Sequence, residues 1–392
     1  MFSHRTNWQL SPNRFTQALE ETRRAGKKIL DLSASNPTRI GLHYDERAIL
    51  GALASSNSLD YDPQSKGLRA ARAAVADYYR NEHGVCDLDP GRLILTSSTS
   101  EGYSYVFSLL CNPGDELLVP KPSYPLFDFL ADLEDVKLVP YPLIYDHGWQ
   151  MDFPSLERAV TPRTRGVIIV HPNNPTGSYV QQQELTLLNA FCRKHNLALI
   201  VDEVFLDYSH DRKKRRTFAV NADVLTFTLS GLSKISALPQ MKVAWMVASG
   251  PAEEVDTAMA RLEVIADTYL SVNAPIQWAL PALLDQRHSI QEQLLERVLA
   301  NLAELDRQLA AQKACERLKL EGGWYAVLRV PVTKSDEDLA IHLLREKSVL
   351  MHPGHFYDFP GDGHLVLSLI TLEEEFKQGI VRVIEELLIA DC

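Results

Sequence analysis

One lysine, placed at the end of an apolar β-rich run, is the first residue of this sequence whose position suggests chemistry. The run covers residues 224–229 and leads into Ser230-Gly231-Leu232-Ser233-Lys234. Burial at a strand end lowers the pKa of an amine, and such a lysine can form a Schiff base with a carbonyl. Lysines beside serines are usually solvated surface residues, so this stretch needs support from elsewhere in the chain.

Two apolar runs upstream each deliver a polar side chain at their carboxyl end. Residues 197–201 are followed directly by Asp202, and residues 166–170 lead into a turn dense in Asn, Pro and Gly that contains Asn174. Continuous apolar runs are typical of strands buried in a parallel sheet. Because ligands bind at the carboxyl edge of an open α/β sheet, we expect the carboxylate and the amide to lie near Lys234.

A third strand predicts a phosphate site at the same edge. Residues 92–96 run into small hydroxyl residues, including Ser98 and Thr99, that could open a helix. Free N–H groups and hydroxyls at a helix N-terminus bind phosphate. The chain lacks a G-x-x-x-x-G-K-[ST] loop and a G-x-G-x-x-G after a strand, which disfavours an unrelated nucleotide-binding α/β protein.

A helix start, an amide, a strand-end aspartate and a lysine in this order resemble the fold-type I pyridoxal-phosphate enzymes, class I/II aminotransferase branch. The resemblance covers nearly the whole chain, and the segments NNPTG (173–177), VDEVF (201–205) and SGLSK (230–234) are its most specific parts. It implies pyridoxal 5'-phosphate as the cofactor. Asp202 would keep the pyridine nitrogen protonated, and Lys234 would hold the aldehyde and shuttle the proton.

The same resemblance implies further contacts with the cofactor. Tyr124 would place its ring against the cofactor. Lys242 stands where the family usually has a phosphate-binding arginine, so the charge is kept while the bidentate geometry is lost. Tyr61 would reach the phosphate of the partner subunit's site, which implies a homodimer with shared active sites. The cofactor-binding residues so implied are Ser98, Thr99, Tyr124, Asn174, Asp202, Ser233, Lys234, Lys242 and Tyr61, and no metal is implied.

One departure from the family concerns the cofactor. Phe205 stands where the motif usually carries a tyrosine, so the hydroxyl that would bond the cofactor's phenolic oxygen is missing. Tyr208, three residues later, is a candidate replacement. The missing partner predicts that the pKa of the cofactor's imine with lysine differs from the family norm.

A second departure concerns the substrate. Val366 stands where the family has an arginine that clamps the substrate α-carboxylate. Asn174 and Arg39, on the turn-rich loop 33–39, are the predicted substrate-binding residues. Arg329 and His355 are weaker candidates for binding the substrate carboxylate.

The favoured function is transfer of an amino group between a small-molecule amino donor and a 2-oxo acid. Another fold-type I enzyme, a C–S or β-lyase or a decarboxylase, would need the same cofactor grip, because reaction type depends on which Cα bond lies perpendicular to the ring. A non-catalytic relative that binds the cofactor is a further alternative. Retention of Lys234, Asp202 and Asn174 together favours an enzyme.

Composition excludes several other classes of protein. The net charge of −11 disfavours a nucleic-acid surface, and we interpret the basic run 212–216 as a solvated loop. No run approaches the length of a membrane span, and the N-terminus has no apolar targeting segment. Five dispersed cysteines suit a reducing compartment and neither a disulfide framework nor a zinc site. These features predict a cytoplasmic protein.

The 392 residues exceed one comfortable core, so two domains are expected. We predict an α/β protein of PLP-dependent transferase fold type I. A large domain, residues 45–284, would hold a mostly parallel central sheet flanked by helices. Residues 1–44 and 285–392 would form a smaller α+β domain, reached through a long helix over about 281–312.

Overall fold

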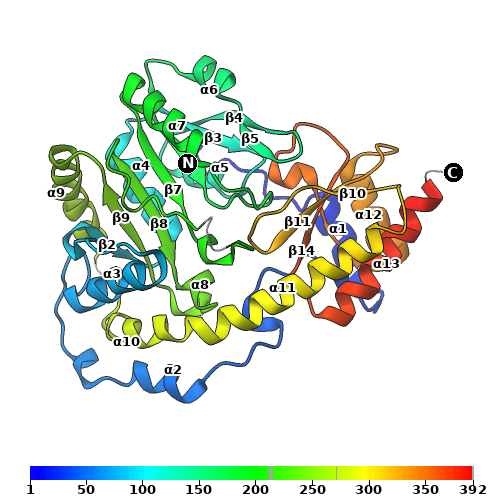
Figure 1. The fold of residues 1–392 in the computed structure, drawn as a ribbon, viewed down its shortest axis with the longest axis horizontal. Coiled ribbons are helices and arrows are strands. Elements are labelled where there is room, and N and C mark those ends of the chain that lie inside the picture. Colours follow the sequence, from blue (N-terminus) through cyan, green and yellow to red (C-terminus); the bar gives the residue numbers. More distant parts are fainter. Residues whose placement is uncertain (212–214, 271, 391–392) are drawn as a thin grey trace.

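The computed structural model describes residues 1–211, 215–270 and 272–390, and its centre is an eight-stranded sheet (Figure 1). The strand order is β2-β9-β8-β7-β6-β3-β4-β5. Neighbours are parallel from β8 through to β4, whereas β9 and β5 run antiparallel to the strands beside them. The strands are β2 (Leu93–Thr96), β3 (Glu116–Lys121), β4 (Lys137–Tyr145), β5 (Trp149–Met151), β6 (Thr164–Val170), β7 (Ala198–Asp202), β8 (Thr226–Gly231) and β9 (Ala244–Ser249).

Helices cover both faces of this sheet, which explains why its central strands read as continuous apolar runs. Every residue of β7 and of β8 is buried. One core cluster joins α4 and α9 to one face, and another joins α7 to the opposite face. The helices around the sheet are α2 (Glu46–Leu53), α3 (Arg69–His83), α4 (Thr99–Leu110), α5 (Phe127–Leu133), α6 (Phe153–Ala159), α7 (Gln182–His195), α8 (Leu232–Ile235), α9 (Ala252–Tyr269) and α10 (Ala274–Asp285).

A second, four-stranded antiparallel sheet has the order β10-β11-β14-β13, and β1 pairs in parallel with β12 beside it. Its core brings together both ends of the chain. Its elements are β1 (Leu30–Asp31), β10 (Glu316–Arg317), β11 (Tyr325–Arg329), β12 (Val349–Leu350), β13 (His352–Pro353), β14 (His364–Ser368), α1 (Arg14–Arg24), α11 (Arg287–Leu309), α12 (Asp336–Lys347) and α13 (Glu373–Ala390). The domain boundaries at residues 45 and 285 stay a prediction.

Short 3₁₀ turns connect these elements and carry several of the polar residues discussed below. They are η1 (His4–Thr6), η2 (Pro37–Arg39), η3 (Ser56–Leu59), η4 (Pro90–Arg92), η5 (Leu206–Tyr208), η7 (Pro239–Met241) and η8 (Gly354–Tyr357).

The predicted long helix over 281–312 is wrong in its bounds. Two helices, α10 and α11, occupy this stretch and are separated at Gln286. The predicted start at Pro281 lies inside α10. The start is set by Asn273, whose side chain accepts a hydrogen bond from Ile276 N at 3.2 Å, the ordinary task of an N-cap residue.

Two other expectations concern the basic run 212–216 and membrane-spanning segments. Residues 212–214 lie outside the described residues, so the interpretation of that part as a solvated loop stays a prediction. At its end, the Arg216 guanidinium donates to the side chain of Gln182. Within the described ranges, no helix is both long enough and apolar enough to cross a membrane.

Candidate active site

Lys234 lies on α8, directly after β8, with its amine among aromatic rings. The Nζ atom is 4.8 Å from the ring centroid of Trp324 and 5.4 Å from that of Phe205. Burial lowers the pKa of Lys234 to about 8, and the negative charge of Asp202 partly opposes this shift. The amine can therefore gain and lose a proton close to neutral pH.

Asp202 ends β7 and is buried, as the strand pattern predicts. Burial raises its pKa to about 6, while hydrogen bonds from Val204 N and the Tyr103 hydroxyl and the charge of Lys234 act in the opposite direction. The two bonds measure 3.0 and 3.2 Å. Sequence reasoning missed Tyr103, although its position one turn into α4, after the predicted phosphate-binding start, is a usable signal.

The start of α4 is the predicted one. Ser98 is the N-cap residue, and its Oγ accepts from Glu101 N at 3.2 Å. Thr99 is the first helical residue, and both side chains are half-buried. A helix N-terminus of this kind presents further N–H groups that an anion can bind.

Three buried polar atoms near these strand ends have no hydrogen-bond partner within the described part of the chain. They are Oδ1 of Asn174, Oγ of Ser230 and Oγ of Ser123. An unpartnered buried polar group costs free energy, and a polar ligand that supplied the partner would remove this cost. Ser230 and Ser123 were not predicted as binding residues. The sequence signal for both is their position, since Ser230 is the next-to-last residue of β8, four residues before Lys234, and Ser123 directly precedes Tyr124.

Three phenols lie in the same region, Tyr124 after β3 of the large sheet and Tyr325 and Tyr357 from β11 and η8. The pKa of Tyr124 is raised by burial and then by the charge of Asp202, which places Tyr124 close to that carboxylate. Tyr325 and Tyr357 have pKa values raised by burial and, in smaller part, by Tyr124. The Tyr325 ring also lies 6.2 Å from Phe205, beside Lys234. Aromatic rings that follow β7 and precede β11 therefore lie around the amine.

Three predicted site residues lie outside this group. Tyr61 is 83% exposed. Lys242 follows η7, is exposed and has a φ of 52°. Arg39 is exposed at the end of η2, where it lines a cavity of about 490 Å³ together with Arg23 and His352.

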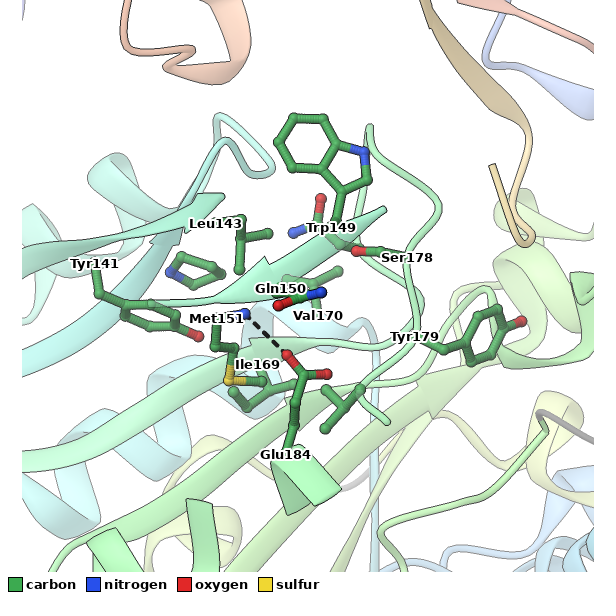
Figure 2. A pocket seen from close by; sticks show the side chains of 13 residues that line it. Tyr141, Leu143, Trp149, Gln150, Met151, Ile169, Val170, Ser178, Tyr179 and Glu184 are labelled. Atoms are coloured by element: carbon green, nitrogen blue, oxygen red, sulfur yellow. Dashed lines mark hydrogen bonds between the residues drawn. The ribbon is translucent and has the colours of Figure 1, made fainter. Parts of the chain in front are cut away.

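A separate small cavity of about 20 Å³ is not the site (Figure 2). It is lined by β4, β5 and β6 residues such as Tyr141 and Met151, and Glu184 enters it by accepting a hydrogen bond from Met151 N at 2.9 Å. Neither Lys234 nor Asp202 lines it. Its volume suits a single water molecule.

Comparisons with known proteins match nearly the whole length of the chain. The family model described as aminotransferase class I and II matches residues 8–376. The chain belongs to this family. It is 28% identical over 364 residues to the glutamate-pyruvate aminotransferase AlaA of Haemophilus influenzae, which covers 91% of this chain and 90% of that protein.

Solved structures of other aminotransferases have the same fold as this chain. An Escherichia coli aminotransferase superposes with a TM-score of 0.86 at 25% identity, over 99% of this chain and 98% of that one. The alanine aminotransferase of Pyrococcus furiosus superposes with a TM-score of 0.90 at 22% identity, over 99% and 100% of the two chains. The prediction of an α/β fold-type I protein with a large, mostly parallel sheet is confirmed.

In this aminotransferase the candidate replacement for the missing tyrosine hydroxyl is already engaged. Tyr208 is fully buried, and its hydroxyl donates to the backbone carbonyl of Lys234 at 2.7 Å. Phe205 instead packs edge-on against Trp324, with ring centroids 5.2 Å apart. The Tyr208 hydroxyl therefore holds the backbone of the lysine segment and is not free to donate to the cofactor's phenolic oxygen.

Proposed function

We propose that this aminotransferase moves amino groups with pyridoxal 5'-phosphate, the cofactor general in its family, held at Lys234. The observation that carries the proposal is the Lys234 amine, which lies among aromatic rings with a pKa of about 8 beside the buried carboxylate of Asp202. Appearance of a yellow chromophore on adding the cofactor, lost on borohydride treatment, tests binding. Conversion of that chromophore by an amino donor alone tests transfer.

The described residues fit this cofactor. Lys234 would hold the aldehyde, Asp202 the ring nitrogen and Asn174 the phenolic oxygen, with Tyr124 against the ring. The phosphate would be held by Ser98, Thr99, Ser233 and Lys242. Asn174 Oδ1 and Ser230 Oγ, which have no partner within the described residues, could each form a hydrogen bond with a polar ligand. When bound, the cofactor supplies an electron-withdrawing ring that makes the substrate Cα–H acidic.

The remaining tasks, proton transfer and stabilisation of charge, fall to side chains of this protein. Lys234 would take a proton at the substrate Cα and return it, a role supported by its pKa of about 8. Asp202 keeps a negative charge at the ring nitrogen. The rings of Trp324 and Phe205, 4.8 and 5.4 Å from the amine, reduce its contact with water, which strengthens electrostatic interactions there.

The exposure of Tyr61 supports the proposal of a homodimer with shared active sites. Its side chain is 83% exposed in the single chain and contacts neither Lys234 nor Asp202 by any hydrogen bond within the described residues. We expect dimers mixed from Tyr61→Phe and Lys234→Ala subunits to transfer amino groups faster than the two parent dimers together. One hybrid site would carry both substitutions and the other neither. Mixed dimers that gain nothing would indicate that each site is built from one chain.

The substrate-side proposal rests on Val366. It is fully buried on β14 and lies opposite His352 of β13 and Val327 of β11. His352 Nδ1 is 3.0 Å from the Tyr357 hydroxyl, and burial lowers the pKa of His352 while Asp31 partly opposes the shift. A neutral imidazole and an apolar valine therefore occupy this row of the sheet. We propose that the substrate carboxylate is held by Arg39 and Asn174 instead.

We expect poor turnover of aspartate, with glutamate and alanine, the amino acids of the reaction named for the glutamate-pyruvate aminotransferase relative, as better donors. Arg39→Ala should raise KM about tenfold, a modest effect because the guanidinium is exposed. Arg329→Ala is the matched control, since Arg329 already pairs with Glu316 at 2.9 Å. Single-turnover reactions with aspartate, glutamate, alanine, aromatic amino acids and carboxylate-free amines provide the measurement. Rapid turnover of aspartate, undiminished by Arg39→Ala, would contradict both parts of this expectation.

The cellular location also stays a proposal. We propose a cytoplasmic enzyme, on the basis of four cysteines that are free within the described residues, Cys86, Cys111, Cys192 and Cys315.

A further inference from the structure

The backbone that carries Lys234 is held by side chains from other elements. Tyr208 Oη donates to the carbonyl of Lys234 at 2.7 Å, and Gln291 Nε2 donates to the carbonyl of Ile235 at 2.9 Å. The last carbonyls of a helix cannot all be bonded within it, and α8 has only four residues. Contacts from η5 and α11 therefore complete the hydrogen bonding of the lysine segment.

The orientation of the Gln291 amide is fixed by a buried carboxylate. The same Nε2 atom donates to Asp207 Oδ2 at 2.7 Å. Gln291 and Asp207 are both buried. Because the two hydrogens of the amide nitrogen serve Asp207 and the Ile235 carbonyl, the amide has one orientation that satisfies both acceptors.

Asp207 is in turn held by the end of α3. His83 Nε2 lies 3.2 Å from Asp207 Oδ1, with both side chains fully buried, and the Tyr78 hydroxyl donates to the same oxygen at 3.1 Å. Burial alone would raise the pKa of Asp207, but the hydrogen bond and charge of His83 reverse the shift and lower it. A buried ion pair contributes little net stability. Because Gln291 links Asp207 to the Ile235 carbonyl, we infer that the pair fixes the position of the lysine backbone.

Helix α11 carries this contact from one sheet to the other. Near its start, Arg287 pairs with Glu82 of α3 at 2.8 Å. Gln291 follows one turn later, and beyond it Leu294 and Val298 pack into the core of the four-stranded sheet. Figure 1 shows α11, in yellow, running from beside α8 toward β10 and α13. The position of the lysine backbone is thus tied to the helix that joins the two cores.

We propose that Gln291, oriented by Asp207 and His83, is a positioning residue that holds Lys234 in register with α11. The inference rests on Lys234 being the reacting amine of the proposed function. Gln291 touches the backbone that follows the lysine and acts through it.

The test follows the reactivity of Lys234 itself in the cofactor-free full-length protein. Trinitrobenzenesulfonate labelling, located at Lys234 by peptide mapping, gives the pH midpoint of the amine. The groups around this amine are Asp202 and the rings of Phe205 and Trp324. Since burial holds the pKa near 8, Gln291→Leu should release the segment and move the midpoint upward by about one unit. In the loaded enzyme, kcat should fall about tenfold with KM nearly unchanged.

A neighbouring glutamine provides the matched control. Gln293, on the same helix, also bonds to backbone groups: it donates to His43 O at 3.0 Å and to Ser289 O at 3.1 Å, and it accepts from His43 N at 2.8 Å. Gln293→Leu should leave the Lys234 midpoint at its wild-type value.

A second variant keeps the proposal testable if Gln291→Leu fails to fold. Tyr208→Phe removes only the hydroxyl bond to the lysine carbonyl and keeps the ring in the core, and it should shift the midpoint in the same direction. A midpoint unchanged from wild type in whichever of these variants folds would overturn the proposal. Because labelling needs no cofactor, this result stays distinct from a failure of the wild-type protein to transfer amino groups.

Discussion

Replacing Lys234 by alanine is expected to slow amino-group transfer by about 10³-fold or more, because a positioned acid–base group contributes roughly 10²–10⁴-fold. β8 and α8 place this amine 4.8 Å from the Trp324 ring centroid, and its pKa of about 8 lets it exchange a proton near neutral pH. Single-turnover transfer from alanine by the purified protein measures the rate. Absorbance of the protein after desalting measures how much cofactor it retains.

Two further lysine variants separate chemistry from charge. Lys234→Arg keeps a positive charge but cannot lose its proton in the working range, so it should be as slow as the alanine variant. Lys137→Ala removes an exposed lysine from β4 and should be indistinguishable from wild type. Transfer by Lys234→Ala at near the wild-type rate would show that another group moves the proton.

The sequence was sufficient to predict the residues whose position depends on local pattern. Lys234, Asp202 and Asn174 each follow an apolar run, and the runs form adjacent strands whose register pairs Asp202 with Val170 on one side and Leu229 on the other. The helix start at Ser98 was predictable for a similar reason, because a hydroxyl residue that caps a helix bonds to N–H groups only three residues away.

The contacts that depend on tertiary packing could not be predicted in this way. Trp324 lies ninety residues from Lys234 in sequence, and no periodicity links the two. The bond from Gln291 to the Ile235 carbonyl and the buried pair of His83 with Asp207 join four separate elements, α11, α8, α3 and η5. The bond from the Tyr208 hydroxyl to the Lys234 carbonyl could not be predicted for the same reason, since the spacing of Tyr208 from Phe205 does not say which group its hydroxyl reaches.

Replacing Asp202 by asparagine is expected to leave part of the cofactor bound while lowering the transfer rate about 10- to 100-fold. A hydrogen bond to a charged group contributes about 1.5–3 kcal/mol, and each 1.4 kcal/mol corresponds to about a factor of ten. Asparagine keeps the size of the side chain and an oxygen that can accept from Val204 N, so the loss reports the charge. Cofactor retention and single-turnover rates are measured on the same preparations.

The pH dependence of cofactor binding distinguishes a charge partner from a structural residue. Burial raises the pKa of Asp202 to about 6, so its carboxylate becomes protonated as the pH falls through that value, and cofactor affinity of the wild-type apoprotein should fall with it. The asparagine variant has no such group and should lose this dependence. Tyr103→Phe removes a hydrogen bond that lowers the pKa of Asp202, so its midpoint should move upward while the carboxylate stays in place. Unchanged transfer by Asp202→Asn, or the same pH dependence in all three proteins, would rule out the role of Asp202 as the partner of the ring nitrogen.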